Sequence, residues 1–301
     1  MESTIQTLLD SLLPPKIKLA YKDFTLISES VTQKVFEATC ATTGQRHTIR
    51  LLDAESEIVK KDHNAAVTLF LQEILYLCSK IEDKTALIIE RFEIHEHTIG
   101  FVMKPFYPLR LELSKQEERT KLQNDTEQIM KNLLADVKFL HTKMNSPDIA
   151  LSLDNVFHLK NGNSFFIGDW GSALIRPDEE KSNKEVNEPS SKGNPLAVQE
   201  IYDLGLLLLE INGVNRQELE DLPKLKNEGM YHGALEFLAK TLNPESKQKL
   251  VKSMLTKEMA NRAKLEELEV FKIIEDVPVS QNTAELKGNF IYWFFLEVFE
   301  T

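Results

Sequence analysis

Residues 197–211, AVQEIYDLGLLLLEI, restrict the fold of this chain more than any other segment. As a helix, this segment would carry apolar side chains on nearly every side, and a helix of that kind is stable only when it is buried. Other elements must therefore surround it, inside a large hydrophobic unit. The chain has 301 residues, enough for one large or two modest domains with such a core.

The first hundred residues follow a different pattern. Short runs rich in β-branched and aromatic residues predict strands, and residues 64–81 have apolar side chains at helical spacing. The expected strands are 22–30, 34–41, 46–53 and two within 86–106. After Pro108 the pattern is mainly helical, with two short strands joined at Asn161-Gly162, which is a hairpin signal. We therefore expect an α+β protein with two lobes: a small five-stranded β lobe with one helix, and a larger, mainly helical lobe.

Composition excludes several classes of protein. The net charge of −11 opposes a general attraction to nucleic acids or anionic membranes. Cys40 and Cys78 are the only cysteines, which argues against a disulfide scaffold and is typical of a reducing compartment. No apolar run reaches the ~18–20 residues of a transmembrane helix, and the first residues lack a basic leader. We expect a cytoplasmic or otherwise intracellular protein with no transmembrane segment and no nucleic-acid partner.

Two further features have alternative interpretations. The segment 289–299, NFIYWFFLEVF, either packs onto its own domain or docks on a partner or a membrane surface. His95 and His97 would share one face of a strand, but no third ligand is close in the sequence. Exposed strand residues are therefore a simpler interpretation of this pair than a metal site.

Several short motifs in a fixed order resemble a protein kinase domain between about Tyr21 and Ile274. The motifs are LADVKFLHTK, DNVFHLKNGNSFFIGDWG, EIYDLGLLLLEI and MLTKEMANRAKLEELEVF. The resemblance implies a bilobal protein kinase-like fold. Its parts would be an N-terminal extension (1–20), a kinase-like N-lobe (21–104), a kinase-like C-lobe (105–275) with the hinge near 104–108, and a C-terminal tail (276–301).

Protein kinases position ATP, neutralise phosphate charge with Mg²⁺ and orient a hydroxyl group. In the loop that would cover the phosphates, Ser28, Ser30 and Gln33 stand where the family has three glycines. Glycine lets backbone amides approach phosphates without a Cβ in the way. An ordinary β-hairpin is therefore favoured over a phosphate cradle, while Val35 matches the residue that would rest on the adenine.

Arg50, in HTIR, stands at the position of the family's phosphate-binding lysine, and Glu73 lies on the following helix as its expected ion-pair partner. The helical phase places Glu73 near the apolar face, which favours the ion pair over a solvated acid. Arginine is planar and forked, so it is not a neutral replacement for lysine beside phosphates. At the hinge, the resemblance implies Met103 as gatekeeper and the Lys104 carbonyl and Phe106 amide as partners of adenine.

The catalytic loop departs most from the family pattern. Anchored on Asn155, the segment DIALSLDN aligns without gaps with H-R-D-L-K-P-E-N. Ala150 then stands at the catalytic aspartate, and a methyl group cannot accept a proton. Asp148 lies two positions earlier and is a candidate substitute if the loop bulges. Ile149 replaces an arginine and cannot hold an activation-loop phosphate, and Glu200 replaces the aspartate that ties this loop to the buried helix.

Asp169-Trp170-Gly171 resembles the D-F-G turn of the family. The resemblance implies that Trp170 is a large apolar plug beneath the helix that carries Glu73. It also implies that Asn155 and Asp169 together hold Mg²⁺ on a bound nucleotide, since Mg²⁺ takes a few protein oxygens and relies on the phosphates for others.

Taken together, these substitutions predict a pseudokinase with impaired or absent phosphotransfer. Such a protein could still bind ATP with Mg²⁺ and would act as a scaffold or regulator through protein partners. One alternative is an atypical active protein kinase that uses Asp148 as base and Arg50 on the phosphates. Another is a kinase-fold transferase with a small-molecule substrate. A preference for Ser/Thr or Tyr cannot be read, because Ser152 replaces the lysine that would indicate it.

Overall fold

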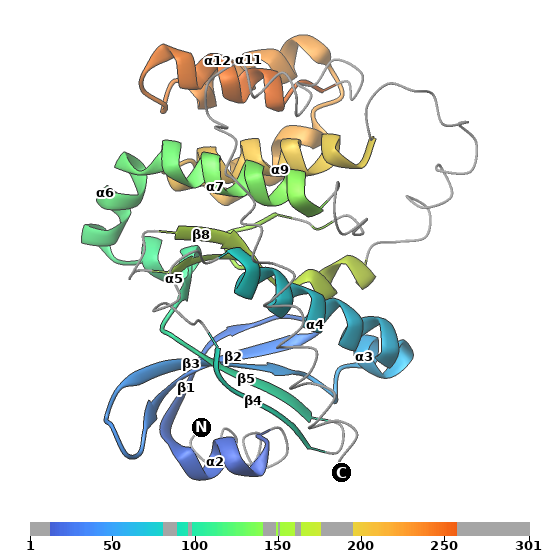
Figure 1. Ribbon diagram of the computed structural model, residues 1–301. Coiled ribbons are helices and arrows are strands. Elements are labelled where there is room, and N and C mark those ends of the chain that lie inside the picture. The colour runs from blue at the N-terminus through green and yellow to red at the C-terminus, as the bar shows by residue number, and fades with distance from the viewer. Residues whose placement is uncertain are drawn as a thin grey trace.

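The computed structural model describes residues 13–80, 89–95, 98–140, 149, 151–159, 164–175 and 195–257. Figure 1 shows a β-sheet with helices at one end of the molecule and a mainly helical part at the other. The expected α+β organisation in two lobes is confirmed.

The N-terminal lobe contains one antiparallel five-stranded sheet, as the sequence predicts. Its strands are β1 (Tyr21–Glu29), β2 (Gln33–Cys40), β3 (Arg46–Leu52), β4 (Ile89–His95) and β5 (Thr98–Met103), in the order β1-β2-β3-β5-β4. Successive side chains of a strand point to opposite faces. Ile49 and Leu51 of β3 therefore belong to the core on one face, whereas Arg50 and Leu52 are buried on the other.

Helices cover both faces of this sheet. The long helix α4 (His63–Lys80) follows the short α3 (Glu57–Lys61) and lies between the sheet and the helical lobe (Figure 1). The opposite face is covered by α2 (Pro15–Ala20), whose Ile17 is fully buried. The sequence does not predict α2, because six residues form a stable helix only through tertiary contacts.

Glu93 of β4 supplies the most specific of these contacts. Its carboxylate accepts hydrogen bonds from the backbone amides of Lys16 at 3.0 Å and Ile17 at 2.9 Å. These amides lie in the first turn of α2, where backbone N–H groups have no partner within the helix. A negative charge at this end of a helix is also favourable to the helix dipole. Glu93 therefore fixes the N-terminal segment to the sheet.

The C-terminal lobe is mainly helical and carries a small sheet on its cleft side. Its helices are α5 (Leu109–Leu113), α6 (Gln116–Asn124), α7 (Thr126–Phe139), α9 (Pro195–Ile211), α10 (Arg216–Asp221), α11 (Glu228–Ala239) and α12 (Glu245–Met254). The sheet contains β6 (Tyr107–Pro108), β7 (Val156–Leu159) and β8 (Ser164–Ile167) in that order, and short 3₁₀ helices are η4 (Trp170–Ile175) and η5 (Leu222–Lys224). Residues 104–106 connect β5 to β6, so the chain passes between the lobes here.

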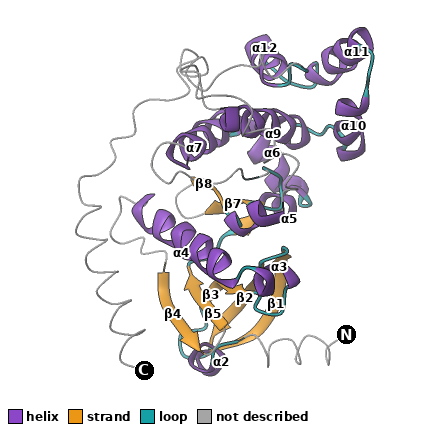
Figure 2. Cartoon of the chain, turned by 90° about the vertical axis from the view of Figure 1, so that its right-hand side faces the viewer, coloured by secondary structure: helices purple, strands orange, loops and turns teal. Residues whose placement is uncertain are grey.

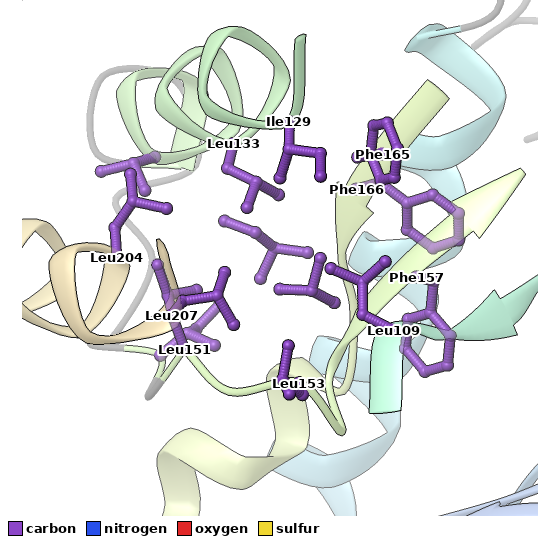
Figure 3. Packing of buried hydrophobic residues seen from close by; sticks show 14 of the residues in the cluster. Leu109, Ile129, Leu133, Leu151, Leu153, Phe157, Phe165, Phe166, Leu204 and Leu207 are labelled. Carbon is purple, nitrogen blue, oxygen red and sulfur yellow. The ribbon is translucent and has the colours of Figure 1, made fainter. Parts of the chain in front are cut away.

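Helix α9 lies at the centre of this lobe, as its sequence predicts. Figure 2 shows it beside α7, and Figure 3 shows Leu204 and Leu207 of α9 opposite Leu133 of α7. These leucines are buried in one hydrophobic core that continues through β7 and β8 to the cleft. None of the helices in the described residues is long and apolar enough to cross a membrane.

We expect Glu93→Ala to lower the free energy of unfolding by about 1–2 kcal/mol, because it removes the acceptor for two amides at a helix N-terminus. Urea denaturation followed by circular dichroism would measure this change. Glu55→Ala is the matched control, since Glu55 forms an exposed pair with Lys60 at 2.9 Å and should contribute less than about 0.5 kcal/mol. Equal losses in the two variants would contradict the role assigned to Glu93.

Candidate functional site

The ion pair expected between Arg50 and Glu73 is present. Arg50 Nη2 on β3 lies 2.5 Å from Glu73 Oε1 on α4, and both side chains are fully buried. Gln33 of β2 bridges the pair: its amide nitrogen donates to Glu73 Oε2 at 3.1 Å, and its amide oxygen accepts from Arg50 Nη2. Gln33 stands at a glycine position of the family, so its side chain fills space that glycine would leave open.

Aromatic rings surround the rest of the Arg50 guanidinium group. Its Nε and Nη1 atoms are buried without a hydrogen-bond partner among the described residues. Its Cζ atom lies 5.7 Å from the ring centre of Phe157, 5.8 Å from that of Phe70 and 6.0 Å from that of Phe106. Rings at this distance attract a cation and offset part of its desolvation. The charge of Arg50 is therefore enclosed by protein groups and has no exposed surface in the cleft.

Glu73 also organises the Asp169-Trp170-Gly171 turn. Its Oε1 accepts from the Asp169 amide at 3.0 Å, and its Oε2 accepts from the Trp170 amide at 3.2 Å. The preceding Gly168 allows this approach, because a Cβ there would lie 2.8 Å from Glu73 Oε1. One buried carboxylate thus joins the sheet, the helix α4 and the first turn after β8.

Trp170 is the apolar plug that the sequence predicts. Its side chain is fully buried, and its ring centre lies 5.5 Å from that of Tyr76 on α4. The indole Nε1 donates to the Ile167 carbonyl at 3.1 Å, which satisfies its only polar group. A second contact between the lobes is made here, because the Tyr76 hydroxyl donates to the buried carboxylate of Asp136 on α7.

Asp169 holds the β1–β2 loop down on the turn. Its backbone has a φ of 57°, which is uncommon for a residue with a side chain. Its Oδ1 accepts from Ser30 Oγ at 2.9 Å and from Thr32 Oγ1 at 3.0 Å. Thr32 is fully buried against Gly171, where a Cβ would lie 2.3 Å from Thr32 Oγ1. We call this contact of Ser30 and Thr32 with Asp169 and Gly171 the interlobe clasp.

The same loop is a tight hairpin, as expected from the loss of the glycines. Ser30 Oγ accepts from the amides of Thr32 at 3.3 Å and Gln33 at 3.1 Å, and the Ser30 amide donates to the Gln33 carbonyl at 2.9 Å. These bonds occupy the backbone amides of Ser30, Thr32 and Gln33. Thr32 was not identified from the sequence, since its importance depends on the distant partner Asp169.

The cleft environment perturbs the acidity of Asp169. Burial and, after it, the negative charge of Glu73 raise the pKa of this carboxyl from 3.8 to about 7, although the hydroxyls of Ser30 and Thr32 and the charge of Arg50 oppose the shift. Near neutral pH the group is therefore about half protonated. A proton and a metal ion would compete for it.

The structure brings Asn155 and Asp169 onto one cavity, as the resemblance implies for a Mg²⁺ site. One oxygen of each side chain already accepts hydrogen bonds: Asn155 Oδ1 accepts from the Ser152 amide at 2.8 Å, and Asp169 Oδ1 accepts from two hydroxyls. Within the described residues there is no group of three or more His, Cys, Asp or Glu that could hold a metal ion. A divalent cation that used Asn155 Oδ1 or Asp169 Oδ1 would therefore compete with these hydrogen bonds.

Thr48 forms hydrogen bonds with the backbone of the hinge. The Phe106 amide donates to Thr48 Oγ1 at 3.1 Å, and the same hydroxyl donates to the Phe106 carbonyl at 3.2 Å. The resemblance assigns this amide to adenine, so adenine would have to displace the hydroxyl. The Phe106 and Met103 side chains are fully buried, while Lys104 is partly exposed. Thr48 was not identified from the sequence, although its position two residues before Arg50 places it on the same face of β3.

The cavity that remains between the lobes is small. Its volume is about 150 Å³, whereas sites that enclose drug-sized ligands have roughly 300–1,000 Å³. It is lined by Val35, Asn155, Phe157 and Asp169 together with Ser28, Ser30, Ser152 and Ser172 among others. The rings of Phe106 and Phe157, with centres 5.2 Å apart, are part of the packing that limits it.

The tie between the catalytic-loop segment and α9 is confirmed. The Ile149 amide donates to Glu200 Oε1 at 3.3 Å, and the Leu151 amide donates to Asp203 Oδ2 at 3.3 Å. Only Glu200 was expected. Asp203 lies three residues further along the helix, on the same face, and this spacing is a signal that could have identified it.

Some sequence predictions concern residues outside the described part of the chain. They include Ala150 and Asp148 of the segment that resembles a catalytic loop, the turn at Asn161-Gly162, His97, residues 1–12 and the tail 276–301. The predictions made for them therefore remain sequence-based.

Comparison with known proteins gives a fold but no family. No protein-family model and no curated protein sequence matches the chain. Among solved structures, the crystal structure of Rad53 1–466 in complex with AMP-PNP matches with a TM-score of 0.50 and 14% sequence identity. The match covers 86% of this chain and 66% of that chain, so this chain spans about two thirds of its length. The chain therefore has a bilobal protein kinase-like fold, with a small β lobe and a larger, mainly helical lobe.

Asp169→Asn should change how stability depends on pH. A folded-state pKa of about 7 against 3.8 for the unfolded chain means that protonated Asp169 stabilises fully below about pH 4. This contribution is lost as the pH rises through about 7. Asparagine keeps an acceptor oxygen for Ser30 and Thr32 but cannot ionise. We expect the variant to gain stability over the wild type between pH 4 and 7, by roughly 2–4 kcal/mol at pH 8.

Urea denaturation at several pH values from 4.5 to 8 would test this expectation. Asp221→Asn is the control, because Asp221 forms an exposed pair with Lys224 and should change stability by less than about 1 kcal/mol. Parallel stability curves for wild type and Asp169→Asn would show that Asp169 does not titrate in this range.

Proposed function

We propose that this chain is a pseudokinase: a protein kinase-like domain that does not transfer phosphoryl groups and acts as a scaffold or regulator of a protein partner. The proposal rests on one observation: protein groups surround the guanidinium group of Arg50 on all sides. Phosphoryl transfer needs a cation at this position that contacts the phosphates of the nucleotide. Arg50 is instead bonded to Glu73 and Gln33, faces three aromatic rings and has no exposed surface.

The sequence of the catalytic loop supports the same proposal. Ala150 stands at the position of the proton acceptor, and the loss of a general base typically lowers a rate by about 10²–10⁴-fold. Asp169 would add to this loss, because its carboxyl is engaged by Ser30 and Thr32 and is half protonated near pH 7.

The clasp and the hinge suggest how such a protein would work without ATP. In an active kinase, nucleotide and metal ions bridge the two lobes. Here the interlobe clasp makes that connection with side chains, and Thr48 occupies the hinge amide. The lobes would then hold one closed arrangement without ligand, and this arrangement would present a fixed surface to a partner. Rad53 was crystallised with a nucleotide analogue, but we expect this chain to bind ATP with Mg²⁺ weakly or not at all.

Thermal denaturation with ATP, with and without Mg²⁺, tests the nucleotide part of the proposal. We expect millimolar ATP to shift the wild-type melting temperature by less than about 1 °C, since a ligand at ten times its Kd would add about 1.4 kcal/mol. The double variant Gln33→Gly/Thr48→Ala removes the bridge to Arg50 and the hinge hydroxyl, so it should bind better than wild type. Thr48→Ser with Gln33 intact is the control, because it keeps both the hinge hydroxyl and the bridge to Arg50. Micromolar binding by the wild type would overturn the closed-cleft interpretation.

Phosphotransfer tests the catalytic part. Incorporation of γ-phosphate from ATP into the protein itself and into generic acceptor proteins should not exceed that of Asp169→Ala. Asp148→Asn tests the alternative, an atypical active kinase in which Asp148 is the base, because this substitution would abolish phosphotransfer by such an enzyme. If wild-type incorporation depends on Mg²⁺-ATP and both substitutions abolish it, the chain is an enzyme and the pseudokinase proposal fails.

A further inference from the structure

Helix α11 carries an apolar face that no described residue covers. Met230 is 63% exposed and Phe237 is 70% exposed, although both are large apolar residues. They are seven positions apart, so they lie on one side of the helix, with Gly233 between them. The other large exposed apolar residues of the described chain, Leu19 and Val31, lie singly in the N-terminal lobe. Exposed apolar residues that lie together mark interaction sites, whereas single ones are ordinary.

Gly233 leaves space on this face for another segment. It lies in the middle of α11, where glycine is the least favourable residue after proline. No atom lies within 4 Å of the place that its Cβ would take, so the described fold has no steric need for glycine here. A glycine allows the backbone of another segment to approach closely. Met230, Gly233 and Phe237 together are called the α11 face.

Lysine side chains make this end of the molecule positive. Helices α11 and α12 lie side by side here, at the end of the helical lobe farthest from the N-terminal sheet (Figure 1). Residues 225–257 contain six lysines and three glutamates, a formal charge of +3 in a chain of −11. Two of the glutamates are paired, Glu236 with Lys252 at 2.7 Å and Glu245 with Lys249 at 3.1 Å. The charges that remain are those of Lys226, Lys240, Lys247, Lys257 and Glu228.

Two of these lysines lie at the ends of α11. Lys226 comes directly before the N-cap residue of the helix, and Lys240 is its C-cap residue. Both are exposed, and neither forms an ion pair within the described part of the chain. An apolar face between two free cationic groups suits an apolar segment that carries acidic residues.

The described part of the chain ends beside this helix. Lys257 is the last described residue, and its ammonium group donates to the carbonyls of Leu225 at 2.7 Å and Lys226 at 2.8 Å. It also lies 5.8 Å from the ring centre of Tyr231 on α11. A further 31 residues lead to position 289, and they span up to about 100 Å when extended. The segment that follows can therefore reach any part of α11, which is about 18 Å long.

We propose that residues 289–299 of the same chain, NFIYWFFLEVF, dock on the α11 face. Nine of these eleven residues are apolar or aromatic, and their burial is favourable. Residues 276–301 contain four acidic residues and one lysine, a formal charge of −3 that complements the +3 of residues 225–257. The aromatic rings of the segment would pack on Phe237 and on the sulfur of Met230, two contacts that aromatic side chains favour.

Charge and connectivity favour this segment over other occupants. A second copy that used the same face would bring two positive surfaces together, which opposes pairing. A separate protein would compete with a segment of the same chain, whose effective concentration is high because it is tethered. The inference concerns a surface away from the cleft, so it does not depend on whether the cleft transfers phosphate.

Trp293 reports whether the segment docks, because it lies within the segment and the only other tryptophan, Trp170, is buried. The full chain is titrated with acrylamide, a neutral quencher, and the fluorescence of Trp293→Phe is subtracted so that the emission of Trp293 remains. We expect Trp293 to be about three-fold or more less accessible to acrylamide than in the urea-unfolded chain. This protection should not depend on protein concentration, since the contact forms within one chain.

Phe237→Ser is the informative variant, because an exposed side chain can be replaced without loss of the fold. We expect it to lower the equilibrium constant for docking by about ten-fold, and so to expose Trp293 to acrylamide. Gly233→Gln should have the same effect by blocking the approach to α11. Glutamine is more favourable than glycine in a helix, so this loss could not come from a weakened α11. Leu19→Ser is the matched control, since Leu19 is 84% exposed on α2 in the other lobe.

A second pair of variants tests the charges. Lys240→Glu should expose Trp293, because it places a carboxylate beside an acidic segment. Lys121→Glu changes the charge of the chain by the same amount on α6, where Lys121 is exposed and pairs with Glu117 at 3.3 Å, and it should leave Trp293 protected. Equal circular dichroism spectra would show that all variants are folded.

Three results would overturn the proposal. The first is a wild-type Trp293 that is as accessible as in the unfolded chain, which would leave the segment free for a partner or a membrane. The second is equal protection in the wild type, Phe237→Ser and Gly233→Gln, which would place the segment on another surface. The third is protection that grows with protein concentration, which would assign the segment to a second copy of the chain.

Discussion

The carboxylate of Glu73 is the interaction on which the cleft depends. Its two oxygens receive Arg50, Gln33 and the amides of Asp169 and Trp170, at distances of 2.5–3.2 Å. A buried ion pair contributes little net stability, because desolvation offsets the Coulomb attraction. Four charge-assisted contacts to one fully buried group instead fix geometry. They set the position of α4 relative to the sheet and the path of the chain after β8.

The remaining features of the cleft follow from that geometry. With its amide fixed by Glu73, Asp169 directs its carboxyl at the β1–β2 loop, where Ser30 and Thr32 donate to it. Ser30 and Gln33 are two of the three residues that stand at glycine positions of the kinase pattern, and glycine there would provide neither the Ser30 hydroxyl nor the Gln33 side chain. One of the two donors of the clasp and the bridge to Arg50 therefore come from residues that replace glycines, whereas Thr32 adds the second donor.

The sequence predicted those features whose signal is local or whose partners are large and apolar. The strands, the buried helix α9, the ion pair of Arg50 with Glu73 and the plug Trp170 all belong to this group. Features were missed where a short polar side chain acts on a residue distant in sequence. Thr48 is 58 residues from Phe106, and Thr32 is 137 from Asp169. Threonine is common in strands and loops, so only the folded chain shows which hydroxyls bond across the cleft.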